Sequence, residues 1–207
     1  MLSALMLAAT FSTVSMDPLT GAIEHYQTVE SYRVTIRSFH SGGDEHIHYY
    51  YKKPGFVRME FVHPHAGAVL VYNPNTRRVR LRPFGTGHFP ELELSPGNSL
   101  IQSMRGQRVD RSDVGALFEN VHALWESGSA EVLAEENMND RTILHFIVTG
   151  AGDFAVSGVH RYELWLDAAT KFPTRITSSD QQGNVIETVI MEALEINPTL
   201  PETLFNP

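Results

Sequence analysis

The first half of the chain alternates apolar and polar positions, which is typical of strands with one buried face. From Tyr32 onward, apolar residues recur at every second position, with charged or polar residues between them. Clusters of glycine, proline and asparagine then interrupt the chain at short intervals, as turns between neighbouring strands do. The pattern predicts five successive antiparallel strands, at 32–37, 46–51, 56–62, 68–72 and 77–82.

Two segments carry apolar residues at helical spacing instead. In the first, Asp17 can cap a helix, Pro18 suits its first turn, and apolar residues recur between 19 and 29. In the second, Ser112 can cap a helix that ends at Gly128, after a short apolar turn at 100–104. The apolar side of this second helix is formed by Leu117, Phe118, Val121, Leu124 and Trp125.

Strands resume after the second helix and continue almost to the end of the chain. They are expected at 131–136, 142–149, 161–167, 174–179 and 185–196. Because strands and helices hardly alternate, the order predicts an α+β fold built on one large antiparallel sheet. A sheet of about ten strands usually curls instead of staying open. Its concave face would then be apolar, with a few short helices to cover it.

Incomplete cover over this concave face would leave an apolar cavity, which is a site for a lipid-like ligand. The residues expected at the cavity and its helical lid are Leu117, Phe118, Val121, Leu124, Trp125, Val57, Met59, Phe61 and Trp165. The alternative is a filled interior, because large side chains such as Trp125, Phe146 and Trp165 could occupy the same space.

The composition is that of a single globular domain, expected at 17–207. The chain has 207 residues, of which 42% are hydrophobic and 19% charged, and it contains no cysteine. We therefore expect no disulfide, no thiol nucleophile and no lipid on an N-terminal cysteine. Residues 1–16 are uncharged and apolar but too short to span a bilayer. They are interpreted as the remnant of a signal sequence or, alternatively, as a helical extension.

The charge is unevenly distributed along the chain. The formal net charge of −8 argues against non-specific binding of nucleic acid, which depends on basic residues. Residues 52–82 nevertheless contain seven basic residues and one acidic residue. Arg78, Arg80 and Arg82 would share one face of their strand. This face is either simply solvated or a docking patch for anionic lipid headgroups or an acidic partner.

Candidate catalytic and metal-binding residues are weak in this sequence. His46 and His48 are two positions apart on a predicted strand, and His63 and His65 flank Pro64, but no third ligand can be nominated. We interpret these histidines as solvated and expect no metal and no cofactor. The motifs of serine hydrolases, phosphate loops and dinucleotide-binding folds do not occur. A non-enzymatic role is therefore expected, with a hydrolase as the less favoured alternative.

Two blocks resemble the LolA-type carriers of outer-membrane lipoproteins and their relatives LolB and RseB. The first block is a basic-Pro-x-x-x-Arg pattern formed by Lys53, Pro54 and Arg58, followed by the Tyr-Asn-Pro strand end at 72–74. The second block contains a strand that ends in aspartate, a proline-led strand, a glycine turn and a closing Asn-Pro…Phe segment. It comprises 162–167, Thr170, 172–175, Gly183, Asn197 and Phe205. The likeness covers 32–205.

The resemblance implies a half-barrel of about eleven strands, with helices as a lid over a cavity for acyl chains. It implies a periplasmic carrier of lipids or lipoproteins, with a membrane-associated protein as a possible partner. The expected gate and docking residues are Lys53, Arg58, Arg78, Arg80 and Arg82. Lys53 stands where LolA has an arginine that keeps the lid closed, so that part of the likeness is incomplete. The main alternative is an RseB-like envelope sensor or protein-interaction module without a transport role.

Overall fold

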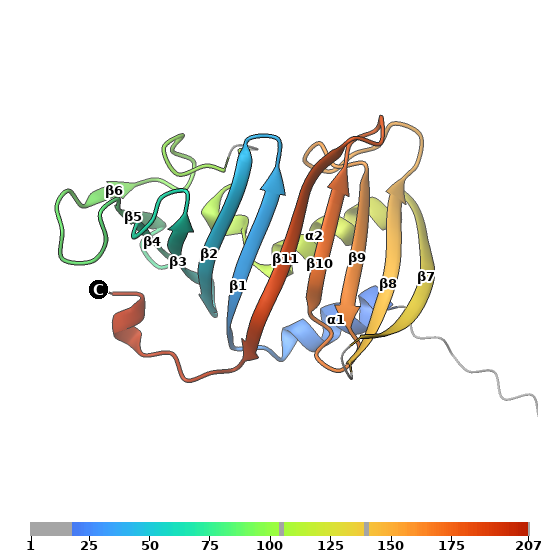
Figure 1. Ribbon diagram of the computed structural model, residues 1–207, viewed down its shortest axis with the longest axis horizontal. Helices are drawn as coiled ribbons and strands as arrows, with labels where there is room; N and C mark the ends of the chain where they lie inside the picture. Colours follow the sequence, from blue (N-terminus) through green and yellow to red (C-terminus); the bar gives the residue numbers. More distant parts are fainter. Residues whose placement is uncertain (1–17, 104–105, 139–140, 207) are drawn as a thin grey trace, which may run out of the picture.

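Eleven strands form one antiparallel sheet, which curls without closing (Figure 1). The computed structural model describes residues 18–103, 106–138 and 141–206. The strands lie side by side in the order β6-β5-β4-β3-β2-β1-β11-β10-β9-β8-β7. The first six are β1 (Ser31–His40), β2 (Gly43–Lys52), β3 (Phe56–His63), β4 (Val69–Asn73), β5 (Arg78–Arg82) and β6 (Leu92–Leu94). The others are β7 (Gly128–Met138), β8 (Arg141–Gly150), β9 (Arg161–Asp167), β10 (Pro173–Ser179) and β11 (Val185–Ile196).

The first and last strands join the two halves of the sheet at its centre. β1 pairs with β11, so that Tyr32 lies opposite Ile196 and His40 lies opposite Glu187. From this seam each half continues outward between strands that are neighbours in the sequence. The predicted α+β fold with one curled antiparallel sheet is confirmed.

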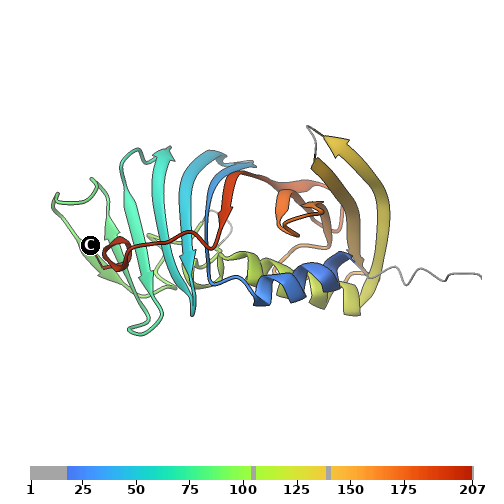
Figure 2. The same cartoon turned by 90° about the horizontal axis from the view of Figure 1, so that it is seen from below.

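Two helices pack on the concave face of the sheet (Figure 2). They are α1 (Pro18–Gln27) and α2 (Val114–Glu126). α2 contacts β7 and β8, and α1 packs against α2. The rest of the concave face lies beneath the segment that precedes α2, which includes a short 3-10 helix at Val109–Arg111.

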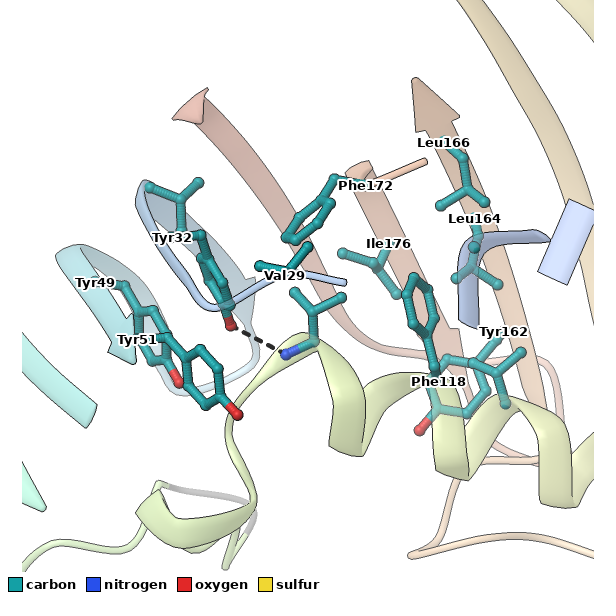
Figure 3. Packing of buried hydrophobic residues seen from close by; sticks show 14 of the residues in the cluster. Val29, Tyr32, Tyr49, Tyr51, Phe118, Tyr162, Leu164, Leu166, Phe172 and Ile176 are labelled. Atoms are coloured by element: carbon teal, nitrogen blue, oxygen red, sulfur yellow. Dashed lines mark hydrogen bonds between the residues drawn. The ribbon is translucent and has the colours of Figure 1, made fainter. Parts of the chain in front are cut away.

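The main core lies between α2 and the concave face (Figure 3). Phe118, Val121 and Leu124 of α2 are at most 2% exposed. They share one apolar cluster with Leu164 and Leu166 of β9. Alternation along β9 and spacing of three to four residues along α2 bring these side chains to the same side. This part of the interior is filled by side chains.

A second apolar cluster lies on the convex face, where the C-terminal segment crosses the sheet (Figure 1). Phe205 is 3% exposed and covers Val69 and Val71 of β4. Arg58 of β3 is also buried there and donates a hydrogen bond from Nη1 to the carbonyl of Leu204 over 2.9 Å. The tail contains one 3-10 turn at Glu202–Leu204.

Several predicted boundaries differ from the structure. The cap of α2 is Asp113 and not Ser112, because the carboxylate of Asp113 accepts hydrogen bonds from the amides of Gly115 and Ala116. The short edge strand β6 was not predicted, since three residues give too little alternation to detect. The expected apolar turn at 100–104 is only partly described, and there Leu100 is 69% exposed.

Residues 1–16, and with them the expected signal sequence, lie outside the described residues, as does Asp17, the expected cap of α1. Across the three described ranges, the helices fall short of the length and apolarity that a membrane span requires.

Candidate functional site

A cavity of about 650 Å³ lies between the sheet and the segment that leads into α2. Small-molecule sites are commonly about 300–1,000 Å³ in volume. One wall is the concave face of strands from both halves of the sheet, β1–β5 and β9–β11. The opposite wall is formed by residues of the range 99–120. The cavity therefore occupies the part of the concave face that the two helices leave uncovered.

The middle of the cavity is apolar. Its sheet wall consists of inward-facing residues of the alternating strands, namely Ile36, Ile47, Met59, Phe61, Leu70, Leu81, Ile176, Val189 and Met191. Ile101 and Leu117 line it from the opposite wall. Such a surface favours an apolar ligand, because burial of apolar area is the main favourable contribution to its binding.

Three tyrosine hydroxyls hold the residues where α2 begins. The hydroxyl of Tyr49 lies 3.1 Å from the hydroxyl of Ser112. The hydroxyl of Tyr26, from α1, donates a hydrogen bond to Oδ1 of Asp113 over 2.8 Å. The hydroxyl of Tyr32 accepts a hydrogen bond from the backbone amide of Val114 (Figure 3, dashed line). We call these three residues the tyrosine clamp.

Two residues of the tyrosine clamp, Tyr32 and Tyr49, are buried, and Tyr26 is half-buried. Burial raises the pKa of the Tyr26, Tyr32 and Tyr49 hydroxyls above its ordinary value, because desolvation disfavours the phenolate. The carboxylate of Asp113 adds to the rise of the pKa in all three cases. Tyr32, Tyr49 and Asp113 also line the cavity, so the clamp forms part of its wall.

The cavity has a polar end near the turn between β1 and β2. Ser38 of β1 lies directly opposite Glu45 of β2, and it donates a hydrogen bond to Oε1 of Glu187 of β11 over 2.5 Å. Glu187 is paired with Ser178 of β10, which is paired in turn with Tyr162 of β9. All five residues line the cavity. They form a polar row across five adjacent strands.

The rim of the cavity is exposed. It includes Ser99, Leu100, His65 and two arginines. Arg108 pairs with Asp110 over 2.6 Å, and Arg111 pairs with Glu119 over 2.7 Å. Both arginine side chains are about half exposed, so their charges belong to the rim.

The structure divides the residues predicted for the cavity and lid into two groups. Met59, Phe61 and Leu117 line the cavity. The others, Trp165 excepted, belong to the main core, with Trp125 half-buried against it. This core group comprises Val57, Phe118, Val121, Leu124 and Trp125. One part of the concave face therefore has the expected cavity, and another part has the filled interior that was the alternative.

Trp165 requires a correction, because it lies on the convex face of the sheet. Its ring stacks on His145 at 4.2 Å between centroids, and the guanidinium of Arg175 lies 4.6 Å from the ring centroid. Its neighbours Leu164 and Leu166 point to the core instead. Residues of opposite phase on a strand face opposite sides, so Trp165 cannot line the cavity.

The arginines predicted for docking have close acidic partners. Arg58 is buried against Glu60 at 2.7 Å, and Arg82 is buried against Glu91 at 2.6 Å. Arg78 and Arg80 are more exposed, and they lie 3.7 Å from Glu93 and 3.9 Å from Glu91 respectively. The positive charge expected from residues 52–82 is therefore partly balanced by acidic residues, most of them outside that range.

Lys53 lies at the junction of β2, β3 and α1. Its Nζ donates a hydrogen bond to the carbonyl of Gln27 over 2.6 Å and lies 3.5 Å from Oε1 of Glu30. Lys53 therefore connects the sheet to the end of α1, and its expected role at a gate stays a prediction.

The histidines show no metal-binding geometry. The rings of His46 and His48 lie 5.6 Å apart on β2. Within the described ranges, no group of three or more His, Cys, Asp or Glu residues could hold a metal ion.

The tyrosine clamp and the polar row were missed by the sequence analysis. Ser38 and Glu45 occupy the positions of their strands that alternate toward the concave face, so the pattern alone could have placed them there. Their proximity to Glu187 depends on pairing between the first and last strands, which the local pattern does not specify.

Comparisons with known proteins show the fold of this chain. No protein-family model matches it, and no curated protein is similar to it in sequence. Among solved structures, an uncharacterised conserved protein of Thermus thermophilus matches with a TM-score of 0.55 and 12% identity, covering 91% of each chain. The lipoprotein LppX of Mycobacterium tuberculosis matches with a TM-score of 0.54 and 8% identity, covering 89% of this chain and 95% of LppX.

A third match is MucB of Pseudomonas aeruginosa, in its complex with MucA. The TM-score is 0.52 and the identity 14%, over 89% of this chain and 60% of the matched chain. At such low identity these matches establish the shared fold alone. They confirm the expected fold, one curled antiparallel sheet with helices on its concave face.

Proposed function

We propose that the protein is a non-enzymatic binding protein that holds the acyl chain of a lipid or lipoprotein in the cavity and acts as a carrier in the periplasm. The observation that carries this proposal is the apolar cavity of about 650 Å³ on the concave face. Burial contributes about 0.8 kcal/mol per methylene, so ten methylenes would contribute about 8 kcal/mol before ordering costs. Useful affinity would therefore require no covalent bond to the ligand.

Loading and release would require the cavity-lining residues that precede α2, within 99–103 and 107–112, to move. The tyrosine clamp connects the C-terminal end of this segment to the sheet and to α1. The part before the clamp includes Leu100, which is largely exposed. We expect this part to open while α2 stays in place. Lys53, Arg78 and Arg80 remain candidates for contact with a partner that delivers or accepts the ligand.

Ligand capture tests the proposal directly. Native mass spectrometry after mild purification should detect a co-purified lipid, and a fluorescent fatty-acid analogue should bind to the delipidated protein. Met191→Trp should fill the cavity and abolish uptake of the probe. Val185→Trp lies on the same strand but is 61% exposed, so uptake should be unchanged. Absence of any bound lipid, together with equal probe binding by both variants, would overturn the proposal.

A second candidate function is a sensory or protein-interaction module. The observation that favours it is the shared fold with MucB, a protein whose structure was solved in complex with MucA. Such a module would bind a protein segment, and lipid would act as a signal instead of a cargo. Cross-linking in the cell envelope, followed by identification of the captured chain, distinguishes the two. A carrier should transfer its lipid to an acceptor, whereas a sensor should keep one stable protein partner.

A further inference from the structure

The polar row gives the cavity two chemically different regions. The apolar region includes Ile36 and Ile47, which lie two residues along their strands from Ser38 and Glu45. A ligand that fills both regions must therefore be amphiphilic. Its chain would lie against the apolar wall and its head group against the polar row.

The polar row is acidic. Two of its five members, Glu45 and Glu187, are carboxylates, and the others carry hydroxyl groups. Ser38 and Ser178 both donate to Glu187, the former to its carboxylate and the latter to its carbonyl oxygen over 3.4 Å. A carboxylate offers about four acceptor positions on its two oxygens, and the bond from Ser38 uses one position on Glu187.

The arginines near the cavity lie away from the polar row, whereas one histidine lies beside it. His40 lies beside the polar row, with Nε2 3.9 Å from Glu45. Arg108 and Arg111 are at the rim and paired with their own carboxylates. Among the described cavity-lining residues, Lys is absent, and His65 stands in an exposed turn of the rim. Among the described cavity-lining residues, the polar end therefore holds two carboxylates, and the arginines stand at the rim.

We propose that the cavity selects amphiphiles whose head group is cationic and carries N–H donors, such as a primary amine, and that it disfavours anionic head groups. This inference rests on the proposed function and specifies its ligand class. An ammonium group would donate to Glu45 and Glu187, and the charge would strengthen these hydrogen bonds. A fatty-acid carboxylate would meet two like charges in a partly dehydrated site, which provides discrimination by repulsion.

Matched ligands of one chain length test the inference. Dodecylamine, dodecanol and dodecanoate, each below its micellar concentration, are titrated calorimetrically into the delipidated protein at pH 7. We expect dodecylamine to bind at least about tenfold more tightly than dodecanoate, with dodecanol between them. Glu187→Gln and the double change Glu45→Gln with Glu187→Gln should weaken the amine and strengthen dodecanoate, so that the preference disappears.

A control variant separates local from overall charge. Glu192→Gln removes one carboxylate from the same strand, but Glu192 is half exposed and pairs with Arg37 on the convex face. It should keep the preference for the amine, and thermal melting should show that all variants fold. Equal affinity for the three ligands, or tightest binding of dodecanoate, would overturn this inference while the carrier proposal stands. Binding of none of them would instead contradict the carrier proposal itself.

Discussion

The hydroxyl of Tyr32 accepts a hydrogen bond from the backbone amide of Val114 over 3.1 Å. Tyr32 lies on the first strand and Val114 is the first residue of α2, and both residues are buried. The first amides of a helix have no partner within the helix, so this side chain satisfies one of them. The bond therefore connects the wall of the cavity to the strand at the centre of the sheet.

Removal of this hydroxyl should destabilise the protein. Tyr32→Phe leaves the buried amide of Val114 without its acceptor, and the expected loss in free energy of unfolding is about 1–3 kcal/mol. Urea denaturation measures the change. Tyr50→Phe is the control, because the hydroxyl of Tyr50 is on the convex face and contacts Glu60 at a long 3.4 Å. A loss of the same size in both variants would contradict the role assigned to Tyr32.

The tyrosine clamp should make the protein sensitive to alkaline pH. Burial raises the pKa of Tyr32 and Tyr49 above the ordinary value of 10.0 for tyrosine, so above pH 10 the folded state holds protons that the unfolded state loses. Their contribution to the free energy of unfolding is therefore complete below pH 10 and decreases as the pH rises further. The slope should approach about 1.4 kcal/mol per pH unit for each buried tyrosine.

Urea denaturation at several pH values between 8 and 11 measures this dependence. Tyr49→Phe should decrease the slope above pH 10, because one buried titrating group is removed. An unchanged slope in this variant would show that other groups cause the alkaline instability.

Gly115 should not tolerate alanine, although alanine favours helices. A Cβ atom at Gly115 would lie 2.5 Å from the ring of Tyr26 and 2.7 Å from Oδ1 of Asp113, the cap of α2. Gly115→Ala should therefore displace the Tyr26 ring and lower the midpoint of thermal unfolding by several degrees, as a loss of about 1 kcal/mol or more would. Gly97→Ala is the control, since its Cβ would have open space. Equal melting temperatures for the two variants would refute the packing argument.

The sequence predicts the sheet well because alternation is a local property. The alternation along β9 also indicates the side of Trp165. Trp165 faces the same side of the strand as Glu163 and the opposite side from Leu164. The expectation that Trp165 lines the cavity disregarded its place in this alternation. In a curled sheet with a polar convex face, the position of a residue in the alternation predicts which face it lies on better than the type of its side chain does.

Other features could not be predicted because they depend on contacts between distant parts of the chain. The filled core and the cavity share one concave face, and their boundary depends on where α2 packs, against β7 and β8. The charges of Arg78 and Arg82 are balanced by Glu93 and Glu91, which approach through the β5–β6 hairpin. A count of charges within 52–82 omits these partners.

Arg58 and Arg78 should differ in their effect on stability. Arg58 is buried and holds both Glu60 and the carbonyl of Leu204, so Arg58→Gln should lower the free energy of unfolding by about 1–3 kcal/mol. It should also loosen the C-terminal segment, which limited proteolysis would detect. Arg78→Gln removes an exposed pair with Glu93 and should cost less than about 1 kcal/mol. Resistance of Arg58→Gln to both tests would contradict its structural role.

Leu117 and Trp165 should give opposite results in ligand binding, although both were expected at the cavity. Leu117→Asn places an amide of similar size in the apolar wall, and burial of its polar groups against an alkyl chain costs about 1–3 kcal/mol. Binding of dodecanol should therefore weaken about tenfold or more. Trp165→Ala removes a much larger side chain, but from the convex face beside His145, so binding should not change. Calorimetry on both variants, with circular dichroism to confirm folding, makes the comparison. Weakened binding in Trp165→Ala with normal binding in Leu117→Asn would mean that the ligand occupies the other face of the sheet.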